Sequence, residues 1–282
     1  MAETMVRQTA EEVAEFGKDI GLIHEVIVTG RKVGAGKEFW SKLAHDEELF
    51  VKTVEFVERD GTELVKEVIV SIPLTEAEKT AIAILGSSRV LTQGQAKGET
   101  ELPIRYSETH FGHAAKENAE QGRDWRLVYL TGNSIRQERE RVGANRKKQP
   151  CFYDNNWWLG DKDDNWAADN FPGYYLIDFN GRFGRTSWQN QEEEIQKLGS
   201  EFVRAHEAMV TEAAFRIFEA TGERLLPNWY HWGRSLVSFG GRVAVGRFGS
   251  EGWRVGGCHP GCGDGDVLRV CLLRKFQLNL EV

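Results

Sequence analysis

The stretch Ser235–Arg274 is the feature of this sequence that most restricts what it can form, because it is rich in Gly and poor in five other amino acids. Lys, Glu, Gln, Met and Trp make up 67 of the 282 residues, so about nine or ten are expected among these forty at the chain's own rate. Glu251 and Trp253 are the two that occur. Short strands and turns are the predicted structure here.

The five depleted amino acids share one genetic property, since none of them is encoded by a codon that ends in a pyrimidine. A Gly-rich strand-and-turn region that avoids long charged side chains is the simpler alternative. That alternative explains the missing Lys and Glu but not the six Arg residues between Arg234 and Arg274. The stretch therefore resembles one that is encoded by codons ending in C or T, in which the first two bases of each codon have varied.

The overall charge restricts the partners of the chain. A formal net charge of -7 and a pI near 5.6 disfavour nucleic acid and anionic membranes, whose binding depends on a basic surface. The sequence has no run of eighteen apolar residues, and residues 1–19 are acidic without the apolar core of a signal peptide. We therefore expect no membrane insertion and a cytoplasmic protein, with surface display by another route left open. The four cysteines are expected to be reduced thiols.

The first 74 residues are predicted to form a small mixed α/β module. Two strands, residues 50–58 and 64–72, flank Asp60 and Gly61, a dipeptide that favours a hairpin turn. The hairpin stops at Pro73, where we place a domain boundary. Residues 75–282 then form the second predicted domain, with its unusual stretch at about 235–274.

In the second domain, capping and periodicity predict several elements. Thr75 and Glu78 are placed as N-terminal caps of a short apolar helix, and residues 107–121 read as a helix ended by Gly122. Predicted strands cover residues 125–130 and 174–179. The basic segment 132–149 alternates with acids and is predicted to be a solvated helix and loop. The longest predicted helix spans residues 189–220, and His206 near its apolar stripe is expected to be a packed or surface residue.

Two candidate metal sites have alternatives without metal. Five Asp residues between 154 and 169 could hold a structural calcium ion, but Asp161–Asn165 lacks the Gly and Glu of an EF-hand loop, so turn chemistry is favoured. Cys258, His259 and Cys262 resemble a zinc knuckle, yet their spacing is not that of common zinc motifs. We expect no cofactor, and keep an enzyme or zinc protein based on these three residues as the alternative.

No Gly-rich phosphate loop, G-x-S-x-G elbow or H-E-x-x-H motif occurs in the sequence. The expectation is therefore that the protein is not an enzyme and has no catalytic residues, although residues distant in sequence can still assemble a site.

A family resemblance rests on three features: Trp229–Ser235 (WYHWGRS), the Gly-rich interval after it, and the closing Leu268–Leu272 (LRVCL). Together they resemble the C-terminus of variable proteins from diversity-generating retroelements. In that family a reverse transcriptase copies a template with errors at adenines, which converts Asn codons into other pyrimidine-ending codons. Ile23–Gly30 also resembles the start of proteins from the candidate phyla radiation of bacteria, where such retroelements abound.

This resemblance implies an α+β fold, with a C-type lectin-like domain of the formylglycine-generating-enzyme branch from about residue 75 onward. It implies a ligand-binding protein whose diversified surface recognises a protein or other macromolecular partner. Alternation along strands would bury framework residues Val243, Val245, Val255, Leu268 and Val270 and expose their neighbours. The predicted ligand-binding residues are Leu236, Ser238, Phe239, Arg247, Phe248, Ser250, Trp253, Arg254, Cys258, His259, Pro260, Cys262 and Asp264.

Overall fold

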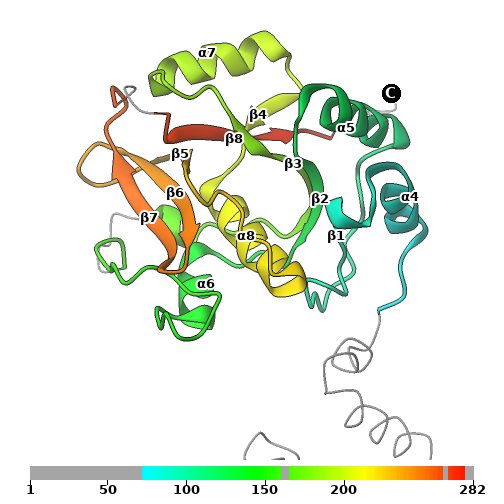
Figure 1. Ribbon diagram of the computed structural model, residues 1–282, viewed down its shortest axis with the longest axis horizontal. Helices are drawn as coiled ribbons and strands as arrows, with labels where there is room; N and C mark the ends of the chain where they lie inside the picture. Colours follow the sequence, from blue (N-terminus) through cyan, green and yellow to red (C-terminus); the bar gives the residue numbers. More distant parts are fainter. Residues whose placement is uncertain (1–71, 160–164, 263–265, 277–282) are drawn as a thin grey trace, which may run out of the picture. The chain divides into compact units, whose positions relative to one another are not determined.

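The computed structural model describes residues 72–159, 165–262 and 266–276 (Figure 1). These residues form a mixed α+β fold with one mixed sheet. The helices among them are α4 (Glu76–Leu85), α5 (Glu108–Gln121), α6 (Ile135–Val142), α7 (Trp188–Leu198) and α8 (Glu207–Thr221). The strands are β1 (Val90–Leu91), β2 (Trp125–Leu130), β3 (Gly173–Arg182), β4 (Phe202–Arg204), β5 (Tyr230–Leu236), β6 (Arg242–Gly249), β7 (Gly252–Cys258) and β8 (Leu268–Arg274). Short 3₁₀ turns cover Ser87–Arg89 and Asn165–Ala168.

The sheet has eight strands in the described residues, in the order β1-β2-β3-β8-β5-β6-β7, with β4 paired to β8 off this path. The pairs β1–β2 and β5–β8 are parallel and the others antiparallel. The last strand among the described residues, β8, therefore lies in the middle of the sheet, next to β3 and β5. In Figure 1 the β6–β7 hairpin stands at the side opposite β1 and α4.

Helix caps in the sequence set the helix boundaries. The Glu78 backbone N–H donates to the Thr75 hydroxyl, and the Glu78 carboxylate accepts the Thr75 N–H at 2.8 Å, which completes the predicted capping box. Ser107 caps α5, and Gly122 ends it in the left-handed conformation. The predicted strands at residues 125–130 and 174–179 are confirmed as β2 and part of β3.

The core lies between the sheet and α8, which contacts β1, β2, β5 and β6. Phe215 of α8 packs against Phe152, Phe248 and Trp253, with ring centroids 4.9, 5.7 and 6.0 Å apart. All five predicted framework residues are buried, with Leu268 the most exposed of them at 7%. The burial prediction therefore holds for these five residues, but the predicted alternation does not hold throughout, because their neighbours Ala244, Gly246 and Cys271 are buried as well.

The predicted helix over residues 189–220 is wrong in one respect, because the chain forms two helices there. Gly199, at φ 121°, ends α7, and Phe202–Arg204 then pairs with β8 before α8 begins. A strand of three residues is too short to interrupt an apolar helical stripe visibly. His206 is the N-cap of α8 and is buried, which agrees with the prediction of a packed or surface residue.

The basic segment 132–149 contains the predicted helix, but it is less solvated than expected. Glu138 of α6 is fully buried, where it accepts hydrogen bonds from Arg141 and lies 3.5 Å from Arg216. Some of the alternating charges therefore form ion pairs with the buried Glu138, and the segment is not wholly solvated. No helix in the described residues combines the length and apolar character that a membrane crossing requires.

The predicted N-terminal module and its Asp60–Gly61 hairpin lie outside the described residues, and the boundary at Pro73 stays a prediction.

Candidate ligand-binding surface

The predicted site residues at the end of β5 lie on an exposed apolar surface. Leu236 ends β5, and Ser238 and Phe239 follow in a turn closed by the Val237 N–H donating to the Gly241 carbonyl oxygen at 2.9 Å. Leu236 and Phe239 are 57% and 65% exposed, whereas Val237 between them is buried. The turn therefore exposes Leu236, Ser238 and Phe239 around the buried Val237.

Trp157 extends this surface from a different part of the chain. Its ring centroid lies 5.6 Å from that of Phe239, and its indole N–H donates to the Val255 carbonyl oxygen at 3.3 Å. The ring of Phe239 also packs over Gly257 of β7. We call the surface formed by Trp157, Phe239 and Gly257 the Phe239 surface; Leu236 and Ser238 lie at the same end of the sheet.

Trp157 was not among the predicted contacts. The sequence signal that could have found it is the Trp157–Trp158 pair in a loop rich in Asp and Asn, of which Trp158 is buried and Trp157 is 36% exposed. Sequence alone does not show which of two adjacent Trp residues faces solvent.

The second group of predicted residues, after β7, lies at the same end of the sheet. Leu236 pairs with Arg242, and Arg242 pairs with Cys258, so the ends of β5 and β7 are aligned. His259 and Cys262 are exposed, and Cys258 and Pro260 are half-buried. The structure thus brings two predicted groups, residues 236–239 and 258–262, to one end of three strands. Asp264 lies outside the described residues.

A third group lies at the other end of the β6–β7 hairpin. Arg247 and Ser250 are exposed near the turn that joins the two strands, and Arg254 pairs opposite Gly246. The guanidinium of Arg254 lies 4.2 Å from the centroid of the Tyr153 ring. Because a strand advances about 3.3 Å per residue, these side chains form a patch separate from the Phe239 surface.

Two predicted contacts, Phe248 and Trp253, are wrong as surface residues, because both are fully buried. The indole N–H of Trp253 donates to the Thr211 hydroxyl at 3.2 Å. The prediction treated large aromatics as poor core residues for so Gly-rich a stretch. Phe248 and Trp253 pack against each other and against Phe215 of α8, which lies outside the stretch, and the β6–β7 register shifts between Gly246 and Gly249.

A polar cluster missed by the sequence analysis lies behind Leu236. The imidazole Nε2 of His206 is 3.2 Å from a carboxylate oxygen of Asp169 and 3.4 Å from the Ser235 hydroxyl. Its Nδ1 accepts the Ala208 backbone N–H at 3.2 Å. In the neutral ring the proton therefore sits on Nε2, which leaves no acceptor for a proton from Ser235. The cluster has the residue types of a catalytic triad but not its geometry.

The zinc alternative gains no geometric support. The described residues contain no group of three His, Cys, Asp or Glu side chains placed to hold a metal ion. The Nδ1 of His259 accepts the Gly261 N–H at 3.2 Å. Of the Asp-rich loop proposed for calcium, Asp161, Asp163 and Asp164 lie outside the described residues, and Asp154 lies 3.4 Å from Arg139.

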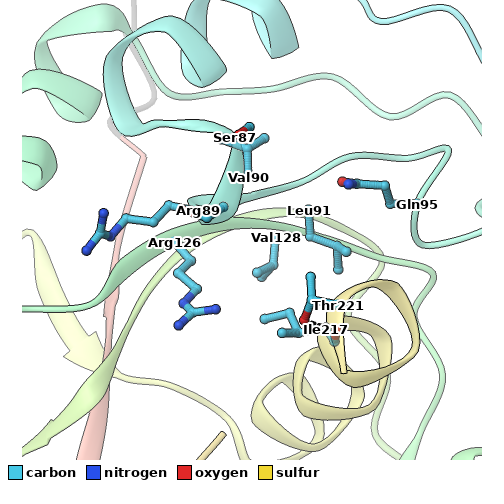
Figure 2. A pocket seen from close by; sticks show the side chains of 10 residues that line it. Ser87, Arg89, Val90, Leu91, Gln95, Arg126, Val128, Ile217 and Thr221 are labelled. Atoms are coloured by element: carbon cyan, nitrogen blue, oxygen red, sulfur yellow. Dashed lines mark hydrogen bonds between the residues drawn. The ribbon is translucent and has the colours of Figure 1, made fainter. Parts of the chain in front are cut away.

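Two hollows elsewhere are too small for a metabolite. The first, about 20 Å³, lies between α8 and the strands β1 and β2 (Figure 2), where Arg126, Leu91 and Ile217 line it. The second, about 90 Å³, is lined by Arg105, Tyr175 and Phe276 among others. Pockets that bind small molecules usually hold about 300 Å³ or more. The first has room for a single water molecule.

Comparison with protein-family models, with curated proteins and with solved structures gave no match.

Proposed function

We propose that this protein binds a macromolecular partner, most simply a protein, through the Phe239 surface and the adjoining residues 258–262. The observation that carries the proposal is the concentration of exposed apolar side chains at this end of the sheet. Among the described residues five large apolar side chains are exposed: Leu74, Trp157, Leu236, Phe239 and Val267. Two of them, Trp157 and Phe239, are in ring contact, and Leu236 lies at the same end of the sheet. Exposed apolar clusters mark interaction sites more often than isolated exposed residues do.

The support for a diversified surface comes from the relation between exposure and composition. Within Ser235–Arg274 the framework valines are buried, while Leu236, Ser238, Phe239, His259 and Cys262 are exposed. Exposed substitutions usually change stability by at most about 0.5 kcal/mol. A scaffold of this kind tolerates variation at the surface positions, as the resemblance to retroelement variable proteins implies. The proposed C-type lectin-like fold rests on that resemblance and on the mixed α+β architecture.

The same features favour binding over catalysis. The neutral His206 ring accepts the Ala208 backbone N–H at Nδ1, so its proton sits on Nε2 and Ser235 has no general base there. The net charge of -7 disfavours nucleic acid as the partner. Broad contact through rigid aromatic side chains is the mode of recognition that suits such a surface.

The genetic part of the proposal is tested in the genome that encodes the chain. We expect a reverse transcriptase gene nearby and a near-identical repeat of the segment that encodes residues 235–274, with adenines at the variable codons. A locus without both would remove the diversification mechanism from the proposal.

The binding part is tested with variants of the immobilised protein. Proteins retained from cells of the same community would be measured again with Leu236→Ser plus Phe239→Ser. We expect at least a tenfold loss of affinity, since central apolar contacts are often worth about 2 kcal/mol or more. Leu74→Ser, another exposed apolar residue, is the matched control and retains binding. Equal binding by the double variant and the control would contradict the proposed surface.

A further inference from the structure

The turn that joins β6 to β7 lies against a short basic segment from another part of the chain. The Gln149 side-chain amide donates to the Ser250 carbonyl oxygen at 3.0 Å, and the Arg146 guanidinium pairs with the Glu251 carboxylate at 2.7 Å. Arg224, which follows α8, donates to the Gln149 side-chain oxygen at 3.3 Å. Three segments that are distant in sequence therefore meet beside one hairpin turn.

Two exposed lysines, Lys147 and Lys148, follow Arg146 in a tight turn of their own. The Lys148 backbone N–H closes this turn by donating to the Asn145 carbonyl oxygen at 2.8 Å. The Arg146 side chain is 65% exposed, and Arg224 is half-buried. We call the surface formed by Arg146, Lys147, Lys148 and Arg224 the Lys148 surface.

The Lys148 surface has more positive charge than its own acidic neighbours neutralise. Within the described residues Glu251 is the carboxylate that pairs with it, and none lies within ion-pair distance of Lys147, Lys148 or Arg224. The Arg224 guanidinium lies instead 4.8 Å from the centroid of the Phe218 ring, and its Nε atom is buried without a hydrogen-bond partner. Four cations therefore stand beside one carboxylate, on a chain whose formal net charge is -7.

We propose that the Lys148 surface binds an acidic segment of a protein, that is, a short run of Asp and Glu residues. Charge complementarity carries this proposal. Charges farther away than about 8–10 Å are screened at physiological salt, so a short acidic segment is attracted by the four local cations. A longer polyanion such as duplex DNA also meets the acidic remainder of the chain, which repels it.

Binding at the Lys148 surface does not require the Phe239 surface. The four cations lie outside Ser235–Arg274, so they do not depend on diversification of that stretch. The contact with Ser250 and Glu251 places them beside the β6–β7 turn. An acidic segment held here would bring its protein to that turn and raise the association rate, as complementary charges at the rim of an interface do.

The experiment measures binding of a fluorescent, end-capped peptide of about eight Glu residues to the full-length protein, followed by anisotropy in about 20 mM salt. We expect this peptide to bind and a neutral Gly-Ser peptide of the same length not to bind. Affinity should fall severalfold in about 200 mM salt, because the screening length drops below about 10 Å. Carbodiimide, which couples a carboxylate to a nearby Lys amine, should link the acidic peptide to Lys147 and Lys148.

Matched variants locate the binding. Lys147→Gln plus Lys148→Gln should weaken the acidic peptide about fivefold, as expected for the loss of two exposed charge pairs. Lys79→Gln plus Lys116→Gln removes the same charge from α4 and α5, which stand opposite the β6–β7 hairpin in Figure 1. This control should keep the affinity within about twofold, and unchanged melting temperatures show that both variants are folded.

Leu236→Ser plus Phe239→Ser should retain the acidic peptide, which separates a failure here from a failure of the proposed function. Three results would each overturn the proposal: no binding of the acidic peptide at low salt, equal weakening by the two lysine variants, or tighter binding of a short DNA duplex or of vesicles of anionic phospholipid. Self-association of the chain at low salt that Lys147→Gln plus Lys148→Gln abolishes would also overturn it, because a second copy would then be the occupant.

Discussion

The ring of Phe239 lies over Gly257, where an added Cβ would come within 2.5 Å of the ring's Cζ atom. That atom is the far end of a side chain that is 65% exposed, so the ring can move away at little cost, whereas the Cγ2 atom of buried Val237, at 3.1 Å, must shift by a few tenths of an ångström. Gly252 differs, since it has φ 103° and a Cβ there would lie 2.6 Å from the Cys151 carbonyl oxygen. Backbone atoms of residues 151–153 leave no room at this second position.

We therefore expect Gly257→Ala to reshape the Phe239 surface without unfolding the protein. Its free energy of unfolding should change by at most about 0.5 kcal/mol, whereas Gly252→Ala should lose about 2 kcal/mol or more through backbone strain. Urea unfolding of the two variants measures the difference. Similar losses at both positions would show that Phe239 is fixed in place by contacts that this account does not include.

Phe239 and Phe248 provide the same substitution in two environments. Phe239→Ala removes an exposed ring and should change stability by at most about 0.5 kcal/mol. Phe248→Ala leaves a cavity among Phe215, Phe218 and Trp253 and should cost about 3–5 kcal/mol. Thermal unfolding followed by circular dichroism distinguishes the two. If Phe239→Ala proves as destabilising as Phe248→Ala, the surface has been mistaken for core.

Local signals in the sequence predicted much of the fold. The capping residues Thr75 and Ser107 and the helix end at Gly122 need only neighbours in sequence, so they were predictable. The strand Phe202–Arg204 was not, because its pairing with β8 depends on residues about seventy positions away.

The candidate site was predictable to a similar extent. Alternation identified the buried framework valines, and the Gly-rich composition predicted short strands and turns without giving the positions of the turns. Phe248 and Trp253 were misplaced because their burial depends on α8 and Phe152, which lie outside the stretch. Trp157 and the cluster around His206 come from other segments, and no spacing within the sequence links them to Phe239.

Stability should depend on pH through His231, which is fully buried. Its Nε2–H donates to the Ala205 carbonyl oxygen and its Nδ1 accepts the Cys271 N–H, both at 3.0 Å, so the ring is neutral. Burial, and then the charge of Arg204, lower the pKa of His231 to about 3. In the unfolded chain the pKa is about 6.5.

Below pH 6.5 the unfolded chain therefore binds a proton at this position that the folded chain does not bind. The contribution of His231 is complete above pH 6.5 and declines by up to about 1.4 kcal/mol per pH unit as the pH falls toward 3. The free energy of unfolding in urea is measured between pH 7.5 and about 5 for the protein and for His231→Gln. This range stays above most carboxylate titrations. A steeper loss in the unmodified protein is expected, and identical slopes would mean that His231 takes up its proton in the folded state.

We propose that variation in this chain is directed to an exposed surface on a fixed frame. The most direct measurement is deep sequencing of the gene from many cells of one natural population. We predict that substitutions concentrate at exposed positions such as Leu236, Ser238, Phe239 and His259, and are absent at the buried Val243, Val245, Phe248 and Trp253. Substitutions spread evenly over exposed positions of the whole chain, or equally frequent at buried and exposed positions of residues 235–274, would contradict it.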